Sequence, residues 1–159
     1  MRLELTRRGD YAVRAMLRLA RTPDEVVAAD RIANETGIPT RFARAILGDL
    51  QQAGLVQGVS GRRGGYRLAV DAARTSLLDV IEAIEGDSRR QTCVLRAAPC
   101  GQDGFCDVHG VFFEAQEQLL ARLGAAALAT LAGDNAAPAL PAVPSGPPTS
   151  GPTAGINDH

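Results

Sequence analysis

The chain has 159 residues, of which 45% are hydrophobic, and this size fits one compact domain with additional segments. The formal net charge is −1, but residues 1–74 hold 13 arginines against 8 acidic residues, whereas residues 75–159 hold 4 against 10. This asymmetry is compatible with a DNA-binding first half, and equally with a chance division of a neutral protein. The sequence has neither an apolar run long enough to span a membrane nor a hydrophobic signal region, so we expect a cytoplasmic protein.

Residues 8–21 are expected to form the first helix, because apolar side chains recur there at steps of three and four residues. This stripe consists of Ala12, Val13, Met16, Leu17 and Ala20. A second helix is predicted over residues 30–36. We expect Asp30 to cap its first turn and Gly37 to end it in a left-handed conformation.

A third helix is predicted over residues 40–53, with Thr40 as its N-cap and Gly54 at its end. Its inner face is expected to hold Phe42, Ile46, Leu47 and Leu50. The order of helix, glycine turn and helix is the helix-turn-helix pattern, whose second helix can enter the major groove of DNA.

Three polar residues at the start of this third helix are the candidates for reading DNA bases: Thr40, Arg41 and Arg44. Arginine can bond the edge of guanine with two hydrogen bonds at once, which is the commonest specific contact in the major groove. The alternative is that these side chains form an ordinary solvated surface.

Two short alternating strands over residues 55–59 and 66–70 flank a glycine-rich turn and predict a β-hairpin. A hairpin directly after a helix-turn-helix is a wing. Arg62 and Arg63 stand at its tip, where we expect them to contact phosphates rather than bases. Gly64 and Gly65 complete the predicted DNA-binding set, because glycine lets backbone amides approach phosphates closely; both also have an expected structural role.

The second half is expected to contain helices over residues 76–85, 108–123 and 125–132. The longest of them aligns Phe112, Ala115, Leu119 and Leu123 in one wide stripe, and we expect it to pair with a second copy of the chain. The segment from residue 135 onward is rich in Pro, Gly, Ser, Thr and Ala, so a disordered tail is predicted there. The predicted fold is mainly α, with a winged helix-turn-helix domain over residues 1–74, a second region over residues 75–134 and a tail over residues 135–159.

All three cysteines lie in one predicted loop, in the pattern Cys93-x6-Cys100-x5-Cys106-x2-His109. Thiolates on a flexible loop can wrap a small iron cluster, because soft sulfur ligands suit iron–sulfur centres. Zinc ribbons usually space their paired ligands two to four residues apart, so zinc fits these wide gaps less well. A thiol redox switch and three unrelated thiols stay open as alternatives. The spacing therefore favours, without proving, an iron–sulfur site.

The chain resembles the Rrf-type family of winged-helix regulators, whose members include IscR and NsrR, over about residues 1–134. The matching strings are Met1-Arg2-Leu3, the run from Asp10 to Met16, the wing string Arg62-Arg63-Gly64-Gly65-Tyr66 and the three cysteines. The resemblance implies a homodimer that binds double-stranded operator DNA under the control of an iron–sulfur cluster.

The resemblance also implies two alternatives for the fourth ligand of that cluster. In IscR-like members a histidine lies three residues beyond the last cysteine, and His109 matches it, implying a 2Fe–2S cluster. In some NsrR-like members an aspartate from the partner subunit ligates a 4Fe–4S cluster, and Asp10 matches that residue. The gap between the first two cysteines is one residue longer than in IscR, and the N-terminus is about two residues longer. Without a ligand role, His109 is a solvated or capping residue, and Asp10 caps the first helix.

We therefore expect a homodimeric transcriptional regulator, a repressor or an activator, that senses redox state, nitric oxide or iron supply through its cluster. A regulator with a thiol switch or bound zinc is the alternative, and a metal-handling protein that uses the helix-turn-helix as a scaffold is a third. The sequence contains no Ser/His/Asp arrangement and no P-loop, so we do not expect an enzyme.

Overall fold

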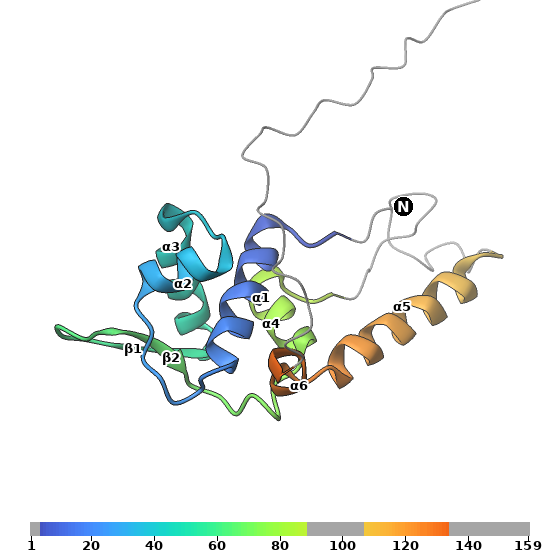
Figure 1. Ribbon diagram of the computed structural model, residues 1–159. Coiled ribbons are helices and arrows are strands. Elements are labelled where there is room, and N and C mark those ends of the chain that lie inside the picture. Colours follow the sequence, from blue (N-terminus) through green and yellow to red (C-terminus); the bar gives the residue numbers. More distant parts are fainter. Residues whose placement is uncertain (1–3, 89–106, 134–159) are drawn as a thin grey trace, which may run out of the picture.

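The computed structural model describes residues 4–88 and 107–133, which form a mainly helical body with one two-stranded sheet (Figure 1). In chain order the elements are α1 (Arg7–Ala20), α2 (Ala29–Thr36), α3 (Thr40–Gln52), β1 (Val56–Val59), β2 (Gly65–Leu68), α4 (Leu77–Glu85), α5 (His109–Ala125) and α6 (Leu128–Gly133). This order confirms the predicted winged helix-turn-helix followed by further helices. No helix in the described part of the chain has the length and apolar character that a membrane span requires.

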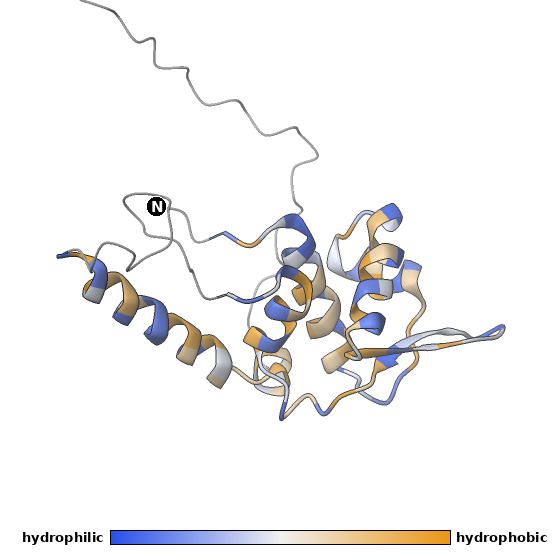
Figure 2. Ribbon diagram, turned by 180° about the vertical axis from the view of Figure 1, so that it is seen from behind, coloured by the Kyte–Doolittle hydropathy of each residue, from blue (hydrophilic) through white to orange (hydrophobic). Residues whose placement is uncertain are grey.

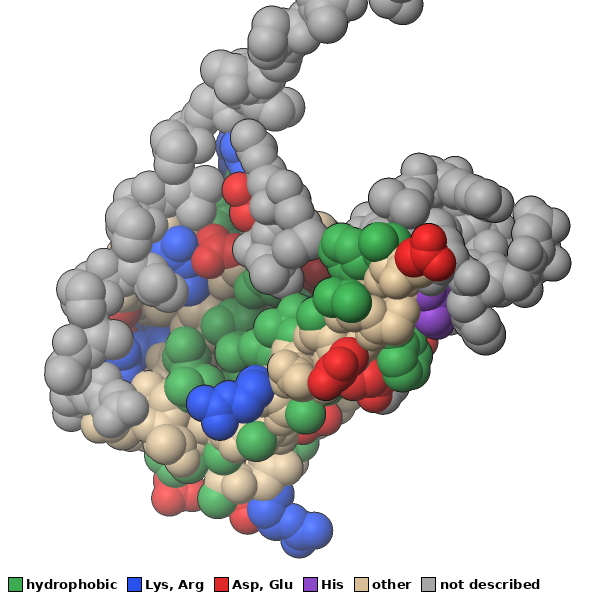
Figure 3. Space-filling model, turned by 90° about the vertical axis from the view of Figure 1, so that its right-hand side faces the viewer, with side chains coloured by type: hydrophobic (Ala, Val, Ile, Leu, Met, Phe, Trp, Pro, Cys, Tyr) green, Lys and Arg blue, Asp and Glu red, His purple; other side chains and the backbone are tan. Residues whose placement is uncertain are grey.

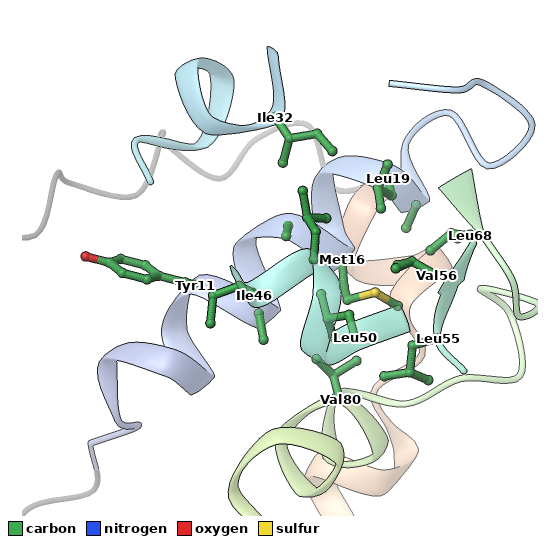
Figure 4. Packing of buried hydrophobic residues seen from close by; sticks show 14 of the residues in the cluster. Tyr11, Met16, Leu19, Ile32, Ile46, Leu50, Leu55, Val56, Leu68 and Val80 are labelled. Atoms are coloured by element: carbon green, nitrogen blue, oxygen red, sulfur yellow. The ribbon is translucent and has the colours of Figure 1, made fainter. Parts of the chain in front are cut away.

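Helix α1 is the centre of the core. Thr6 caps it, since the Thr6 hydroxyl accepts a hydrogen bond from the Gly9 amide at 3.1 Å. Met16 and Leu19 are fully buried, and Figure 4 shows side chains of α3, the hairpin and α4 converging on them. The predicted stripe is only partly right, because the fully buried face of α1 also includes Tyr11 and Ala15, while Val13 and Leu17 are half-buried.

Helix α2 begins one residue earlier than predicted. Its N-cap is Ala28, which makes no side-chain hydrogen bond, so the prediction that Asp30 caps this helix is wrong. The preceding backbone is held from elsewhere, because the amide and carbonyl of Val27 both bond to Tyr66 of β2 at 2.9 Å. The end of α2 is as predicted, with Gly37 in the left-handed region at φ 69°.

Helix α3 starts with a backbone cap rather than a side-chain cap. The carbonyl of Pro39 accepts from the amides of Phe42 and Ala43 at 2.8 and 3.2 Å, so Thr40 is the first helical residue and its predicted capping role is wrong. The helix ends before Gly54, which has a φ of 76° as its predicted role requires. The buried side chains of this helix are Ala43, Ile46, Leu47 and Leu50. Phe42 is absent from that face because its side chain is 39% exposed, which corrects the prediction that it points inward.

The wing is an antiparallel hairpin in which Val56 lies opposite Leu68 and Val59 lies opposite Gly65. Its two glycines have structural causes. A Cβ on Gly65 would lie 2.4 Å from the carbonyl oxygen of Val27, and a Cβ on Gly64 would lie 2.5 Å from that of Val59. Because both obstacles are backbone atoms, a side chain at Gly65 would force β2 away from the segment before α2, and a side chain at Gly64 would distort the turn of the hairpin.

The C-terminal helices return to the start of α4. The Leu77 amide donates to the Ala126 carbonyl at 2.8 Å, and the Leu128 amide donates to the Thr75 carbonyl at 2.9 Å. Helix α6 then packs against α1. Helix α5 is therefore anchored at its C-terminal end, while its first turns project away from the body (Figure 1).

A network of ion pairs joins α1 to α2. Glu35 accepts hydrogen bonds from Arg18 Nε and from Arg31 Nε, the latter at 2.7 Å. Arg31 also donates to Glu25 at 2.7 Å. The Arg18 side chain is buried, so its charge needs this partner. Chiefly through the hydrogen bond from Arg18, and then that from Arg31, the pKa of Glu35 is lowered from its ordinary value of 4.5.

We expect Glu35→Gln to lower the Tm at neutral pH and to have progressively less effect as the pH falls below 4.5. The pKa of Glu35 is lower in the folded state than in the unfolded state, so its stabilisation is complete above the unfolded value and disappears as the pH falls through the folded value. Thermal unfolding of both proteins across this range measures the effect. The control is Asp24→Asn, since Asp24 is exposed and forms no ion pair within the described residues. A Tm difference that stays constant over the whole range would contradict the prediction.

Candidate functional site

The helix-turn-helix and the wing extend from the same side of the body, opposite to α5 (Figure 1). The predicted base-reading residues Thr40, Arg41 and Arg44 all lie in the first turns of α3 and are exposed. Arg62 and Arg63 are exposed at the tip of the hairpin. The fold therefore brings the two predicted sets of DNA-binding residues to one side of the molecule, where a duplex can contact both.

The two arginines of α3 have different surroundings. The guanidinium of Arg44 lies 3.5 Å from Asp30 of α2, a weak contact between two exposed side chains. The guanidinium of Arg41 lies over the ring of Phe42 instead, 4.6 Å from its centroid. A DNA phosphate or base that approaches Arg44 has to compete with a carboxylate, whereas no carboxylate among the described residues forms an ion pair with Arg41.

The hairpin carries a third arginine that the sequence analysis did not select. Arg67 of β2 donates from Nε and Nη2 to the side-chain oxygen of Gln57 at 3.2 and 3.0 Å. Gln57 lies directly opposite Arg67 in the sheet, and both side chains are exposed. The alternation with buried Leu68 was the available sequence signal, since it places Arg67 on the outer face of the strand.

The cysteines Cys93, Cys100 and Cys106 lie outside the described residues. His109 is the first residue of α5, and its ring stacks on that of Phe113 with centroids 5.9 Å apart. The described ranges contain no group of three or more His, Cys, Asp or Glu side chains arranged to hold a metal ion. Of the predicted cluster ligands, the described residues include two, Asp10 in α1 and His109 in α5.

One carboxylate oxygen of Asp10 is buried and lacks a hydrogen-bond partner among the described residues. Its Oδ1 accepts from Arg14 Nε at 2.8 Å, but its Oδ2 is buried without a hydrogen-bond partner in the described part of the chain. Leaving a buried acceptor unsatisfied costs about 1–3 kcal/mol, and binding to a metal would remove this cost. The capping role is wrong for Asp10, because Thr6 is the N-cap of α1. This oxygen is the feature of the structure that fits a cluster ligand.

Asp10 and His109 of one chain do not meet. Asp10 lies in the first turn of α1, within the body, whereas His109 starts α5 at the end that projects from it (Figure 1). The two residues therefore cannot both bind one cluster within one chain. Asp10 also connects to the helix-turn-helix, because Arg14 donates through Nη1 to the carbonyl of Thr36, next to Gly37, at 3.4 Å.

The projecting part of α5 is apolar over much of its surface. Its exposed large side chains are Val111 (70%), Phe112 (39%), Phe113 (54%) and Leu119 (36%). Figure 2 shows hydrophobic residues recurring along this helix, and Figure 3 shows them as patches along its length. Leu120 is its buried contact with the body. An exposed apolar surface of this kind is typical of a protein–protein interface.

A helix-turn-helix followed by an arginine-bearing wing defines the class of winged-helix transcriptional regulators. The comparisons with known proteins specify the family. Residues 5–134 match the model of the Rrf2 family, described as iron-dependent transcriptional regulators. The chain belongs to this family.

Several relatives are similar over most of their length. The chain is 33% identical over 131 residues to the transcriptional regulator IscR of Xenorhabdus nematophila, covering 81% of this chain and 79% of that protein. It is 32% identical over 123 residues to the transcriptional repressor NsrR of Streptomyces coelicolor, covering 76% and 82%. These relatives are regulators rather than enzymes, as predicted.

Solved structures confirm the fold. CymR of B. subtilis, described as the global cysteine regulator of that organism, superposes with a TM-score of 0.72 at 21% identity, covering 82% of this chain and 97% of CymR. IscR of T. potens superposes with a TM-score of 0.64 at 25% identity, covering 81% and 85%. The similarity to CymR, at this low identity, establishes the shared architecture alone.

Proposed function

We propose that the chain is a homodimeric regulator whose affinity for operator DNA depends on an iron–sulfur cluster held by Cys93, Cys100 and Cys106. The observation that carries the proposal is the match of residues 5–134, which include all three cysteines, to a family described as iron-dependent. Such a cluster would supply a centre that reacts with oxidants or nitric oxide. The expected cytoplasmic location belongs to the same proposal, because operator DNA lies there.

The proposed DNA-binding unit comprises residues 1–74. In it α3 enters the major groove, where Arg41 and Arg44 read bases, and Thr40 supports them at the start of the helix. Arg62 and Arg63 contact phosphates from the wing, in which Gly64 permits the tight turn and Gly65 permits the close approach of β2 to Val27. The exposed positions of these side chains support the proposal.

The proposed dimer and cluster region comprises residues 75–134, with residues 135–159 as a tail. The exposed apolar surface of α5 supports pairing with a second copy of the chain. The fourth ligand is His109 for a 2Fe–2S cluster or Asp10 for a 4Fe–4S cluster. His109 is supported by its place three residues after Cys106, and Asp10 by its unpartnered buried oxygen.

Arg14 offers a route from the cluster to DNA when Asp10 is the ligand. It contacts Asp10 and the carbonyl of Thr36 at once, so a shift of Asp10 changes a support of the turn between α2 and α3. Control of this kind needs a coupling free energy of about 1–3 kcal/mol, which changes affinity by about 5- to 150-fold.

A cluster-free regulator with a thiol switch is the second candidate function. It is favoured by the similarity in fold to CymR, which is described as a global cysteine regulator. In that case the three cysteines would change their oxidation state without iron. A zinc site on the same cysteines is the remaining variant of this alternative.

Anaerobic purification of the full chain tests the proposal. We expect a brown protein that contains iron and acid-labile sulfide, with absorption and electron paramagnetic resonance spectra that identify the cluster type. Replacing Cys100 with Ala should remove the iron, the sulfide and both cluster spectra. Protein that binds zinc only, or no metal, would refute the cluster; a reversible loss of free thiols on oxidation of the metal-free protein would then establish the thiol switch.

A further inference from the structure

Phe42 occupies an unusual position for a large apolar side chain of α3. It is 39% exposed, although the neighbouring Ala43 and Ile46 of the same helix are buried. Its ring contacts two residues of different character. Arg41 lies with its guanidinium carbon 4.6 Å from the ring centroid, and Tyr11 of α1 has its ring centroid 5.9 Å away at an interplanar angle of 33°. Phe42 therefore lies between the core and a predicted base-reading arginine.

Tyr11 gives the Phe42 ring a fixed support. Its side chain is only 5% exposed, and Figure 4 shows it at the margin of the core cluster. Two aromatic rings at this separation attract each other beyond the burial of their surface. The orientation of Phe42 is thus set by α1 as well as by its own helix.

Arg41 differs from Arg44 in how it is held. Arg44 has the Asp30 carboxylate 3.5 Å away, whereas no carboxylate in the described part of the chain pairs with Arg41. A guanidinium that lies over an aromatic ring is attracted to the face of that ring. The five N–H donors of the guanidinium lie in the guanidinium plane and remain available for hydrogen bonds. The contact with Phe42 therefore orders Arg41 without occupying the donors that would bond a guanine.

We propose that Phe42 is a positioning residue that holds the guanidinium of Arg41 ready for bidentate contact with a base in the major groove. The inference rests on the proposed role of α3 in DNA reading and adds a specificity determinant that itself touches no base. An arginine that is already ordered loses less conformational freedom on binding, and the gain applies only to a duplex that offers the matching acceptors.

The test uses the full chain, purified anaerobically, and two duplexes of equal length. One is selected by the wild-type chain from a randomised pool, and the other has a random sequence. We expect Phe42→Leu to lower the ratio of the two affinities about two- to fivefold, the effect of losing one exposed cation–π contact. Arg41→Ala should lower it about 5- to 150-fold, as for one lost bidentate contact. Phe42→Tyr, which keeps the ring, should retain the wild-type ratio.

The double variant Arg41→Ala/Phe42→Leu separates positioning from a merely structural role. In the Arg41→Ala background, Phe42→Leu should no longer change the ratio of the two affinities. An equal decrease with and without Arg41 would overturn the inference. An unchanged ratio in the single variant Phe42→Leu or Arg41→Ala would overturn it as well. Arg62→Ala is the control for phosphate contact, because it should weaken both duplexes alike and reduce the salt slope by about one. A wild-type chain that selects no duplex would refute the proposed function and this inference together, whereas selective wild-type binding with unaffected Phe42→Leu would refute the inference alone.

Discussion

Only one of two alanine variants, His109→Ala or Asp10→Ala, is expected to lose the cluster from the anaerobically purified protein. In the proposed function each residue would complete a different cluster type with the three cysteines, and the two lie in separate parts of one chain. Loss of a ligand leaves an iron site incomplete, so the affected variant should contain little iron and sulfide, while the other should match the wild type. Iron and sulfide content per chain, with the absorption spectrum, measure this result.

Asp107→Ala is the matched control for the ligand variants. Asp107 is an exposed carboxylate next to Cys106, and it is a candidate for neither cluster type. It should retain the cluster. Asp10→Asn adds a second comparison. Its side-chain oxygen can still accept a hydrogen bond from Arg14, but the negative charge of the carboxylate is lost. Equal cluster content in His109→Ala and Asp10→Ala would show that the fourth ligand has been assigned incorrectly.

Leu119→Asp is expected to convert the proposed dimer into a monomer and to weaken binding to a two-half-site duplex about 10²- to 10⁴-fold, the gain that linking two binding modules provides. Leu119 is 36% exposed and lies two turns after Phe112 on the same side of α5. A buried unpaired charge at that interface would be costly. Light scattering gives the oligomeric state, and titration of the duplex gives the affinity.

Ala121→Asp is the matched control for this variant. Ala121 is also exposed on α5, but it is about 200° around the helix axis from Leu119. The same charge placed there should leave the dimer and its DNA affinity unchanged. A dimeric Leu119→Asp protein would show that α5 is not the interface, and a monomer formed by both variants would point to general damage to the helix.

The order of elements was predictable because its signals are local. Gly37 and Gly54 end their helices in left-handed conformations, and the glycine turn between the two strands marks the wing. The helix starts were not predictable in the same way. Asp30 is a good capping residue by type, but the bonds between Val27 and Tyr66 decide where α2 begins, and these residues are far apart in sequence.

The candidate site shows the same division. Arg41, Arg44, Arg62 and Arg63 were identified from their elements, and all are exposed where expected. The outward position of Phe42 was not predicted from the sequence. Helical periodicity gives the spacing of side chains, but it does not show whether a neighbouring helix leaves room for an aromatic ring. The contact of Tyr11 with Phe42 likewise depends on how α1 packs against its neighbours, and so does the buried Asp10 oxygen without a hydrogen-bond partner in the described part of the chain.

The anchored end and the projecting end of α5 have a consequence for cluster assembly. The helix has 17 residues, which corresponds to a rod about 25 Å long with His109 at its outer tip. Antiparallel packing of two such helices in the proposed dimer would carry the His109 end of each toward the body of the other subunit, which contains its α1 and therefore its Asp10. With Asp10 of the partner subunit as the proposed fourth ligand, assembly and metal loading would be thermodynamically linked, so dilution alone would release iron, and added iron and sulfide would shift a weak equilibrium toward the dimer.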